Sequence, residues 1–102
     1  MKIETTASVQ TTDTGAHNLI AAGATGVTND IVSLAITNET AASTVVSLSD
    51  GTKTYKFAIA SGGGIMYNPV TPLPATSAAT AWTVTSSAGV TLDFVCVYLQ
   101  NA

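Results

Sequence analysis

Hydrophobic and polar residues alternate most regularly in the segment 43–60, STVVSLSDGTKTYKFAIA. The alternation predicts two β-strands joined at Asp50-Gly51, because Asp and Gly tolerate the positive φ that a tight two-residue turn requires. Such a turn pairs Ser49 with Thr52, and a slip of one residue would mix the two faces of the hairpin. The predicted apolar face holds Val46, Leu48, Tyr55, Phe57 and Ile59, and the other face holds Val45, Ser47, Ser49, Thr52, Thr54 and Lys56.

The rest of the chain has the same short period of two, interrupted by turns. Strands are expected at 2–10, 17–21, 31–37, 65–67, 82–85 and 91–100, with 21–30 as a loop and Val32, Leu34 and Ile36 on one face. The glycines at 61–64 break the chain, and the three prolines of 68–74 predict an extended crossing outside any sheet. Segment 1–10 has few apolar residues, so it is either an edge strand or an arm that packs on a neighbour.

No stretch has a helical period of useful length, and seven or eight short strands separated by turn signals predict an all-β protein. We expect a single domain over residues 1–102, folded as an antiparallel β-sandwich. The long crossings between strands favour a jelly roll of about eight strands over a simple meander.

The last predicted strand, TLDFVCVYLQ, is apolar on both faces. Because such strands are covered on both sides, we expect a second subunit to cover the side that faces away from the core. Asp93 either lies at the wet end of this strand or pairs with a lysine across a subunit contact. The candidate residues for the subunit contact are Val95, Val97, Leu99, Ile65 and Tyr67, and the change Val97→Asp is expected to give monomers.

Charge is scarce and slightly negative. Charged residues make up 9% of the chain, which has three lysines, no arginine and a formal charge of −3. Nucleic-acid binding depends on neutralising phosphates with Lys and Arg, so this composition argues against a nucleic-acid partner. No run approaches the roughly 20 apolar residues of a membrane span. The first ten residues contain no apolar signal region, so we expect synthesis in the cytoplasm without a signal peptide.

Candidate chemistry is sparse. His17 has no triad-like motif around it, and Cys96 lies between two valines in an apolar strand, where a reactive thiol is not expected. The six carboxylates are scattered, so no metal site is predicted, although a calcium site built from loop oxygens stays an alternative. Ser61 and the three glycines after it lack the rest of a phosphate loop. We therefore expect no cofactor and no enzymatic activity.

Three segments carry a family resemblance: VVSLSDGTKTYKFAIASGGG, PVTPLP and AWTVTSSAGVTLDFVCVYLQ. In pattern and composition they resemble the small β-sandwich virion proteins of tailed bacteriophages, in particular the capsid decoration or cement proteins. The resemblance spans roughly the last two-thirds of the chain. It implies a jelly roll, assembled as a homotrimer, that binds the phage major capsid protein on the outer surface of the virion and stabilises the shell.

Two alternatives remain open at this stage. One is another small virion component of the tail, neck or fibre with the same sandwich. The other is a carbohydrate-binding module that stacks sugars on Trp82, Tyr67 or Tyr55, which would require these aromatic rings to be exposed.

Overall fold

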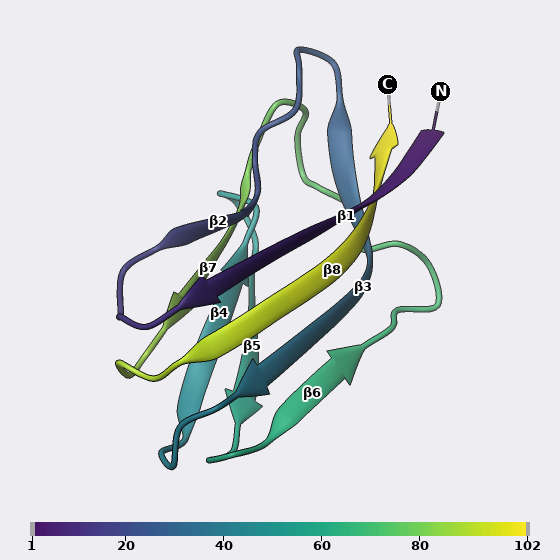
Figure 1. Cartoon of the computed structure of the whole chain (residues 1–102). Coiled ribbons are helices and arrows are strands. Elements are labelled where there is room, and N and C mark those ends of the chain that lie inside the picture. Colours follow the sequence, from purple (N-terminus) through teal and green to yellow (C-terminus); the bar gives the residue numbers. More distant parts are fainter. Residues whose placement is uncertain (1, 102) are drawn as a thin grey trace.

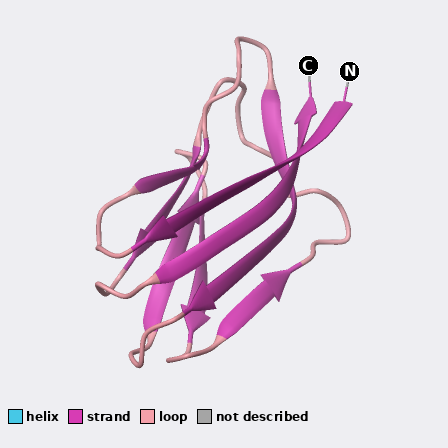
Figure 2. Cartoon of the chain, viewed as in Figure 1, coloured by secondary structure: helices cyan, strands magenta, loops and turns pink. Residues whose placement is uncertain are grey.

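The computed structural model describes residues 2–101, which form eight strands and no helix (Figures 1 and 2). The strands are β1 (Lys2–Thr11), β2 (His17–Ile20), β3 (Thr28–Asn38), β4 (Thr44–Ser49), β5 (Thr54–Ile59), β6 (Gly64–Tyr67), β7 (Trp82–Ser86) and β8 (Leu92–Asn101). Sheet A has the order β1-β8-β3-β6, and sheet B has the order β2-β7-β4-β5. Every neighbouring pair is antiparallel. Every connection except β4–β5 crosses from one sheet to the other, as in a jelly roll. The predicted all-β sandwich is confirmed.

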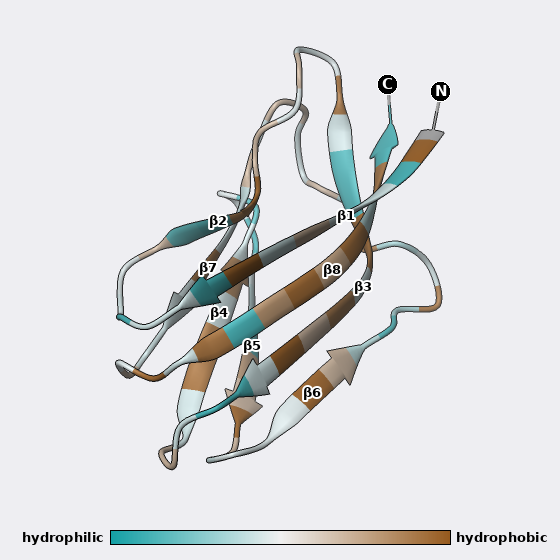
Figure 3. Ribbon diagram, viewed as in Figure 1, coloured by the Kyte–Doolittle hydropathy of each residue, from teal (hydrophilic) through white to brown (hydrophobic). Residues whose placement is uncertain are grey.

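The two sheets stack face to face, and each strand turns alternate residues into the space between them (Figure 1). Trp82 and Val84 of β7, together with Leu92, Phe94 and Cys96 of β8, are among the buried residues of this core. Leu34 and Ile36 of β3 and Val46 and Leu48 of β4 complete its centre. The apolar character of β8 extends over most of its length, so this strand also presents hydrophobic residues on the side away from sheet B (Figure 3).

The β4–β5 hairpin has the predicted faces but not the predicted register. Ser49 pairs with Thr54, and not with Thr52, so the loop contains four residues. The Asp50 carboxylate explains the longer loop, because its Oδ1 accepts hydrogen bonds from the backbone N–H groups of Thr52 (2.9 Å) and Lys53 (2.8 Å). Gly51 supplies the positive φ, 94°. The register differs by two residues, and an even shift leaves each side chain on its predicted face.

Strand β3 begins three residues before the predicted start, and its N-terminal half contains a β-bulge. The pairing with β8 shifts between Ile31 and Ser33, which leaves Val32 as the extra residue of the bulge. Ile31 is fully buried and Val32 is half-buried, so the prediction that Val32 shares a face with Leu34 is wrong. A bulge reverses the alternation of side chains on either side of it, and the sequence pattern alone does not reveal that change.

Strand β1 is one of the two edge strands of sheet A. It pairs with β8 without interruption from Lys2–Asn101 to Thr11–Leu92. Met1, which the predicted segment 1–10 included, lies outside the described residues, as does Ala102 of the predicted domain. The pairing brings the two ends of the chain side by side at one end of the sandwich (Figure 1).

The proline-containing crossing between β6 and β7 is tied to both sheets. Leu73 and Ile31 of β3 exchange two backbone hydrogen bonds of 2.7 and 2.9 Å. Farther along, the N–H of Thr76 donates to Oδ2 of Asp50 at 2.7 Å, which connects the crossing to the β4–β5 hairpin of sheet B. Asp50 is 2% exposed. Burial acts to raise the pKa of Asp50, but the hydrogen bonds from Thr76, Lys53 and Thr52 outweigh it and lower the pKa to about 2.

Candidate interaction surface

The side of sheet A that faces away from sheet B has an apolar centre. Because β8 lies between β1 and β3, its outward residues occupy the middle of this face. Val95 is 51% exposed, while Val97 and Leu99 are half-buried. The strand is therefore not covered on both sides within one chain.

A row of small and apolar residues crosses sheet A at this point. Val95 pairs with Ser8 of β1 on one side and with Ala35 of β3 on the other, and Ala35 pairs with Met66 of β6. Met66 is 74% exposed at the edge of the sheet. We call the four residues Ala35, Met66, Val95 and Val97 the sheet A patch. Exposed apolar residues are common singly, but a contiguous group is typical of an interaction site.

The five residues predicted to form a subunit contact lie on two different faces. Val95, Val97 and Leu99 point outward from sheet A. Ile65 and Tyr67 pair with Ile36 and Leu34, whose side chains are in the core, and both pack against that core. Cross-strand partners share a face, so these two residues do not join the outward group. The Tyr67 ring instead contacts the ring of Phe57, with 5.6 Å between centroids.

Met66 is the outward residue that sequence reasoning missed. It lies between two inward residues, Ile65 and Tyr67, so strict alternation within the segment 65–67 would have identified it. The signal was weak because the β6 strand has only four residues.

Acidic residues border the sheet A patch at both ends. Asp93 lies two residues before Val95 on the same face, near the start of β8, and accepts a hydrogen bond from Gln10 Nε2 (3.0 Å). A hydrogen bond to Asp93, together with its negative charge, raises the pKa of the neighbouring Glu39 carboxyl group. At the opposite end, Leu99 pairs with Glu4 and Asp30. Asp93 thus lies at the wet end of its strand, in contact with a second carboxylate.

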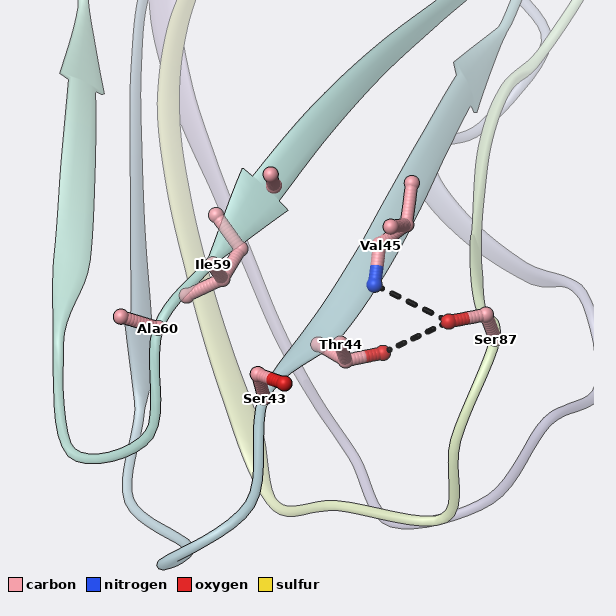
Figure 4. Close-up of a pocket in the computed structure, with 7 residues that line it drawn as sticks. Ser43, Thr44, Val45, Ile59, Ala60 and Ser87 are labelled. Carbon is pink, nitrogen blue, oxygen red and sulfur yellow. Dashed lines mark hydrogen bonds between the residues drawn. The ribbon is translucent and has the colours of Figure 1, made fainter.

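Sheet B carries an open depression at the end of its β4–β5 pair (Figure 4). We call it the sheet B depression; it is lined by Ser43, Thr44, Val45, Ala58, Ile59, Ala60 and Ser87. Val45 is 41% exposed and is the cross-strand partner of Ala58. The Ser87 hydroxyl accepts a hydrogen bond from the Val45 N–H at 3.0 Å, and the Ser87 N–H donates to the Val45 carbonyl at 2.9 Å. These bonds hold the wall of the depression in place.

Both lysines whose side chains are described belong to this hairpin. Lys53 lies in the loop and Lys56 on β5, where Lys56 is two residues from Ala58 on the same outward face. Both are exposed, and within residues 2–101 neither forms an ion pair. The cationic side chains of sheet B and the carboxylates that border the sheet A patch therefore belong to different surfaces of the molecule.

The residues considered for catalysis do not form a reactive site. His17 Nε2 lies 2.7 Å from Asp13 Oδ1, and this hydrogen bond is the main cause of the lowered pKa of Asp13. None of the hydrogen bonds made by residues 2–101 joins His17 to a hydroxyl or thiol group. Cys96 is buried, and burial raises its pKa to about 11, so the thiolate is scarce at neutral pH.

The described part of the chain holds no cluster of three or more His, Cys, Asp or Glu side chains that could bind a metal ion. It also contains no helix long and apolar enough to cross a membrane.

The aromatic residues considered for sugar stacking point into the sandwich. Trp82 is fully buried, and its Nε1 donates to the backbone carbonyl of Asn29 at 2.7 Å. Tyr55 lies beside it, with 6.3 Å between ring centroids, and packs against the core as Tyr67 does. A sugar-binding platform needs an exposed ring face, which the buried Trp82 does not provide.

Comparison with known proteins found similarity in three-dimensional structure alone. No family model and no curated protein sequence matches the chain. A chain in the acidic stable capsid structure of Helicobacter pylori bacteriophage KHP30 superimposes with a TM-score of 0.62 and 14% identity. The match covers 97% of this chain and 93% of the KHP30 chain. This protein has a phage-capsid-like fold.

A second phage capsid gives the same result. A chain in the capsid asymmetric unit of cyanophage Pam1 matches with a TM-score of 0.59 and 11% identity, over 96% of this chain and 84% of the Pam1 chain. A Clostridium thermocellum xylanase 10B chain that holds CBM22-1 and GH10 modules matches with a TM-score of 0.45 and 11% identity, over 97% of this chain and 25% of the xylanase chain. A likeness this low does not support a sugar-binding role.

Proposed function

We propose that this protein is a non-enzymatic structural component of a phage particle, namely a decoration protein that binds the outside of the head as a homotrimer and stabilises the shell. The observation that carries the proposal is the match to chains of two phage capsids over nearly all of this chain and most of each capsid chain. In each case the sandwich accounts for most of the matched capsid chain, 93% of the KHP30 chain and 84% of the Pam1 chain.

The chemistry of the surface supports the same role. A decoration protein needs a stiff fold and surfaces that bind other proteins, and it needs no reactive group. The sandwich offers an exposed apolar patch on sheet A and an open depression on sheet B. Its low charge also favours a molecule that is partly covered by other subunits, because charge is a main determinant of the solubility of single molecules.

Shell stabilisation follows from binding alone. A ligand that binds the assembled shell and not its separated subunits stabilises the shell in proportion to the logarithm of its concentration over its Kd. A trimer strengthens this effect, because its second and third contacts form at a high effective concentration. Three copies of a weak contact therefore hold the shell firmly without any covalent chemistry.

The test is to locate the protein on purified particles of the phage that encodes it. We expect gold-labelled antibodies against the chain to bind intact heads, and heads that lack the protein to release DNA at a lower temperature. Adding back the purified chain should restore the release temperature. Its absence from purified heads would overturn the proposal, and gold label confined to the tail or neck would favour the other virion component.

The oligomeric state is a separate measurement. Light scattering across a wide dilution should give three times the 10.3 kDa mass of one chain. A monomer at every concentration would overturn the homotrimer while leaving a head location open to the antibody test.

A further inference from the structure

We propose that copies of this chain associate head to tail, with the sheet A patch of one copy packed against the sheet B depression of the next. The inference deepens the proposed function and rests on it, because it assigns the two surfaces through which the proposed homotrimer forms. The occupant of each surface is thus a second copy of the chain.

The sheet A patch has a projecting side chain, and the sheet B depression is a hollow. Met66 projects from the edge of sheet A with 74% of its surface exposed, and its flexible, unbranched side chain suits an irregular hollow. The sheet B depression presents such a hollow beside the exposed Val45 (Figure 4). The small Ala58 also lines it. The insertion of Met66 would cover apolar atoms on both copies.

The charged residues beside the two surfaces have opposite signs and lie at the same distance along their strands from an apolar residue. On sheet A, Asp93 lies two residues from Val95 along β8, and Glu39 lies near Asp93, two residues after Thr37, the cross-strand partner of Asp93. On sheet B, Lys56 lies two residues from Ala58 along β5. Two residues of a strand span about 7 Å, so apolar contacts formed at Val95 and Ala58 allow the lysine to reach the carboxylate pair.

The contact between Asp93 and Glu39 provides a reason for this pairing. Two neighbouring carboxylates repel each other when both are ionised. A lysine from a second copy would relieve the repulsion. By contrast, a twofold contact of two sheet A patches would bring the acidic borders of both copies together, and like charges across an interface are unfavourable.

Two different surfaces on each chain make a heterologous contact, which closes into a ring or continues as a filament depending on the rotation between copies. The proposed homotrimer requires a rotation between copies that closes the ring. In the ring every sheet A patch and every sheet B depression is covered, so the exposed Val95, Met66 and Val45 are all buried in the assembly.

The decisive test mixes two variants that each lose one surface. Met66→Glu damages the sheet A patch, and Ala58→Glu damages the sheet B depression. Both side chains are exposed, so the substitutions are expected to leave folding intact. We expect each variant alone to be monomeric by light scattering. An equimolar mixture should form a heterodimer of twice the chain mass, because one intact surface remains on each partner.

A matched control carries the same charge change elsewhere. Asn18→Glu introduces an exposed glutamate on β2, at the other edge of sheet B, and should keep the mass of the unmodified protein. Circular dichroism and urea unfolding of all three variants establish that they fold.

A charge exchange tests the pairing of Lys56 with the carboxylates. Lys56→Glu alone should weaken association by about tenfold, in line with the coupling of close charge pairs in other interfaces. Adding Glu39→Lys to the same chain should restore most of the lost affinity between copies. A double variant that associates no better than Lys56→Glu alone would overturn the assigned pairing.

The two proposals fail in different ways. If the unmodified protein is a trimer but folded Met66→Glu and Ala58→Glu variants remain trimers, or stay monomeric when mixed, then the assigned surfaces are wrong while the head location stands. Growth of the unmodified protein into filaments would overturn the closed ring. Absence of the protein from phage heads would overturn the proposed function, whatever the mixing experiment shows.

Discussion

Asp50 is predicted to contribute strongly to stability, because its carboxylate joins two distant parts of the chain. Oδ1 accepts the N–H groups of Thr52 and Lys53 within the hairpin loop, and Oδ2 accepts the N–H of Thr76 on the crossing. Asp50→Asn keeps the size of the side chain. It removes the negative charge and places an NH2 group against one of these donors. We therefore expect a less stable protein with a looser connection between the hairpin and the crossing.

The magnitude follows from the lowered pKa. The pKa of Asp50 falls from 3.8 to about 2 on folding. A shift of one unit corresponds to about 1.4 kcal/mol, so the ionised carboxylate contributes at most about 2 kcal/mol. Because the folded pKa is the lower one, this contribution is fully present above the unfolded pKa and is lost as the pH falls towards the folded pKa. At pH 3 about half of the contribution should remain.

The assay is urea unfolding at one fixed chain concentration, at pH 7 and at pH 3. We expect the stability difference between the unmodified protein and Asp50→Asn to shrink by about 1 kcal/mol between these two conditions. Glu4→Gln, which removes an exposed carboxylate from β1, is the control and should change stability by less than about 0.5 kcal/mol. An equal Asp50→Asn difference at both pH values would refute the linkage between the charge of Asp50 and folding.

Three further predictions concern single positions in strands. Gly64→Ala would place a methyl group 2.6 Å from a carbonyl oxygen of β3, so it should lower the free energy of unfolding in urea by about 1–3 kcal/mol. Gly89→Ala is the control and should lower it less, because the nearest atom to the added methyl group is 3.7 Å away. Cys96, whose pKa burial raises to about 11, should resist a thiol reagent at pH 8 until urea unfolds the chain; rapid labelling of the folded protein would contradict its burial. Trp82→Phe leaves the Asn29 carbonyl without its donor and should lower the free energy of unfolding by about 1–3 kcal/mol. In the unmodified protein, the fluorescence emission of Trp82 should not shift when glycans are added.

The faces of the strands could be predicted from the sequence alone. Alternation of side chains is a local property of extended backbone, so it separates Val46 and Leu48 from Val45 and Ser47 without knowledge of any partner strand. The same reasoning places Val95 and Val97 on the side of β8 opposite Phe94 and Cys96. The absence of a helical period and the number of turns were enough to predict the sandwich.

Register and pairing depended on contacts between distant residues. The four-residue hairpin loop is stabilised by Asp50, whose carboxylate also binds Thr76 on a segment 26 residues away. No pattern within the hairpin itself indicates that contact. The bulge at Val32 likewise depends on how β3 pairs with β8. It places Ile31 in the core instead of Val32, and the sequence does not distinguish these two adjacent β-branched residues.

The sheet A patch also depends partly on the local sequence and partly on the tertiary structure. The sequence determined that β8 has an outward apolar face, because both of its faces are hydrophobic. Only the tertiary structure decided what surrounds that face, since the pairing of β6 with β3 turns Tyr67 inward and Met66 outward, and the chain brings Glu39 against Asp93. Side-chain direction along one strand is a matter of local geometry, whereas the neighbours of a side chain across a sheet are decided by the packing of segments far apart in the chain.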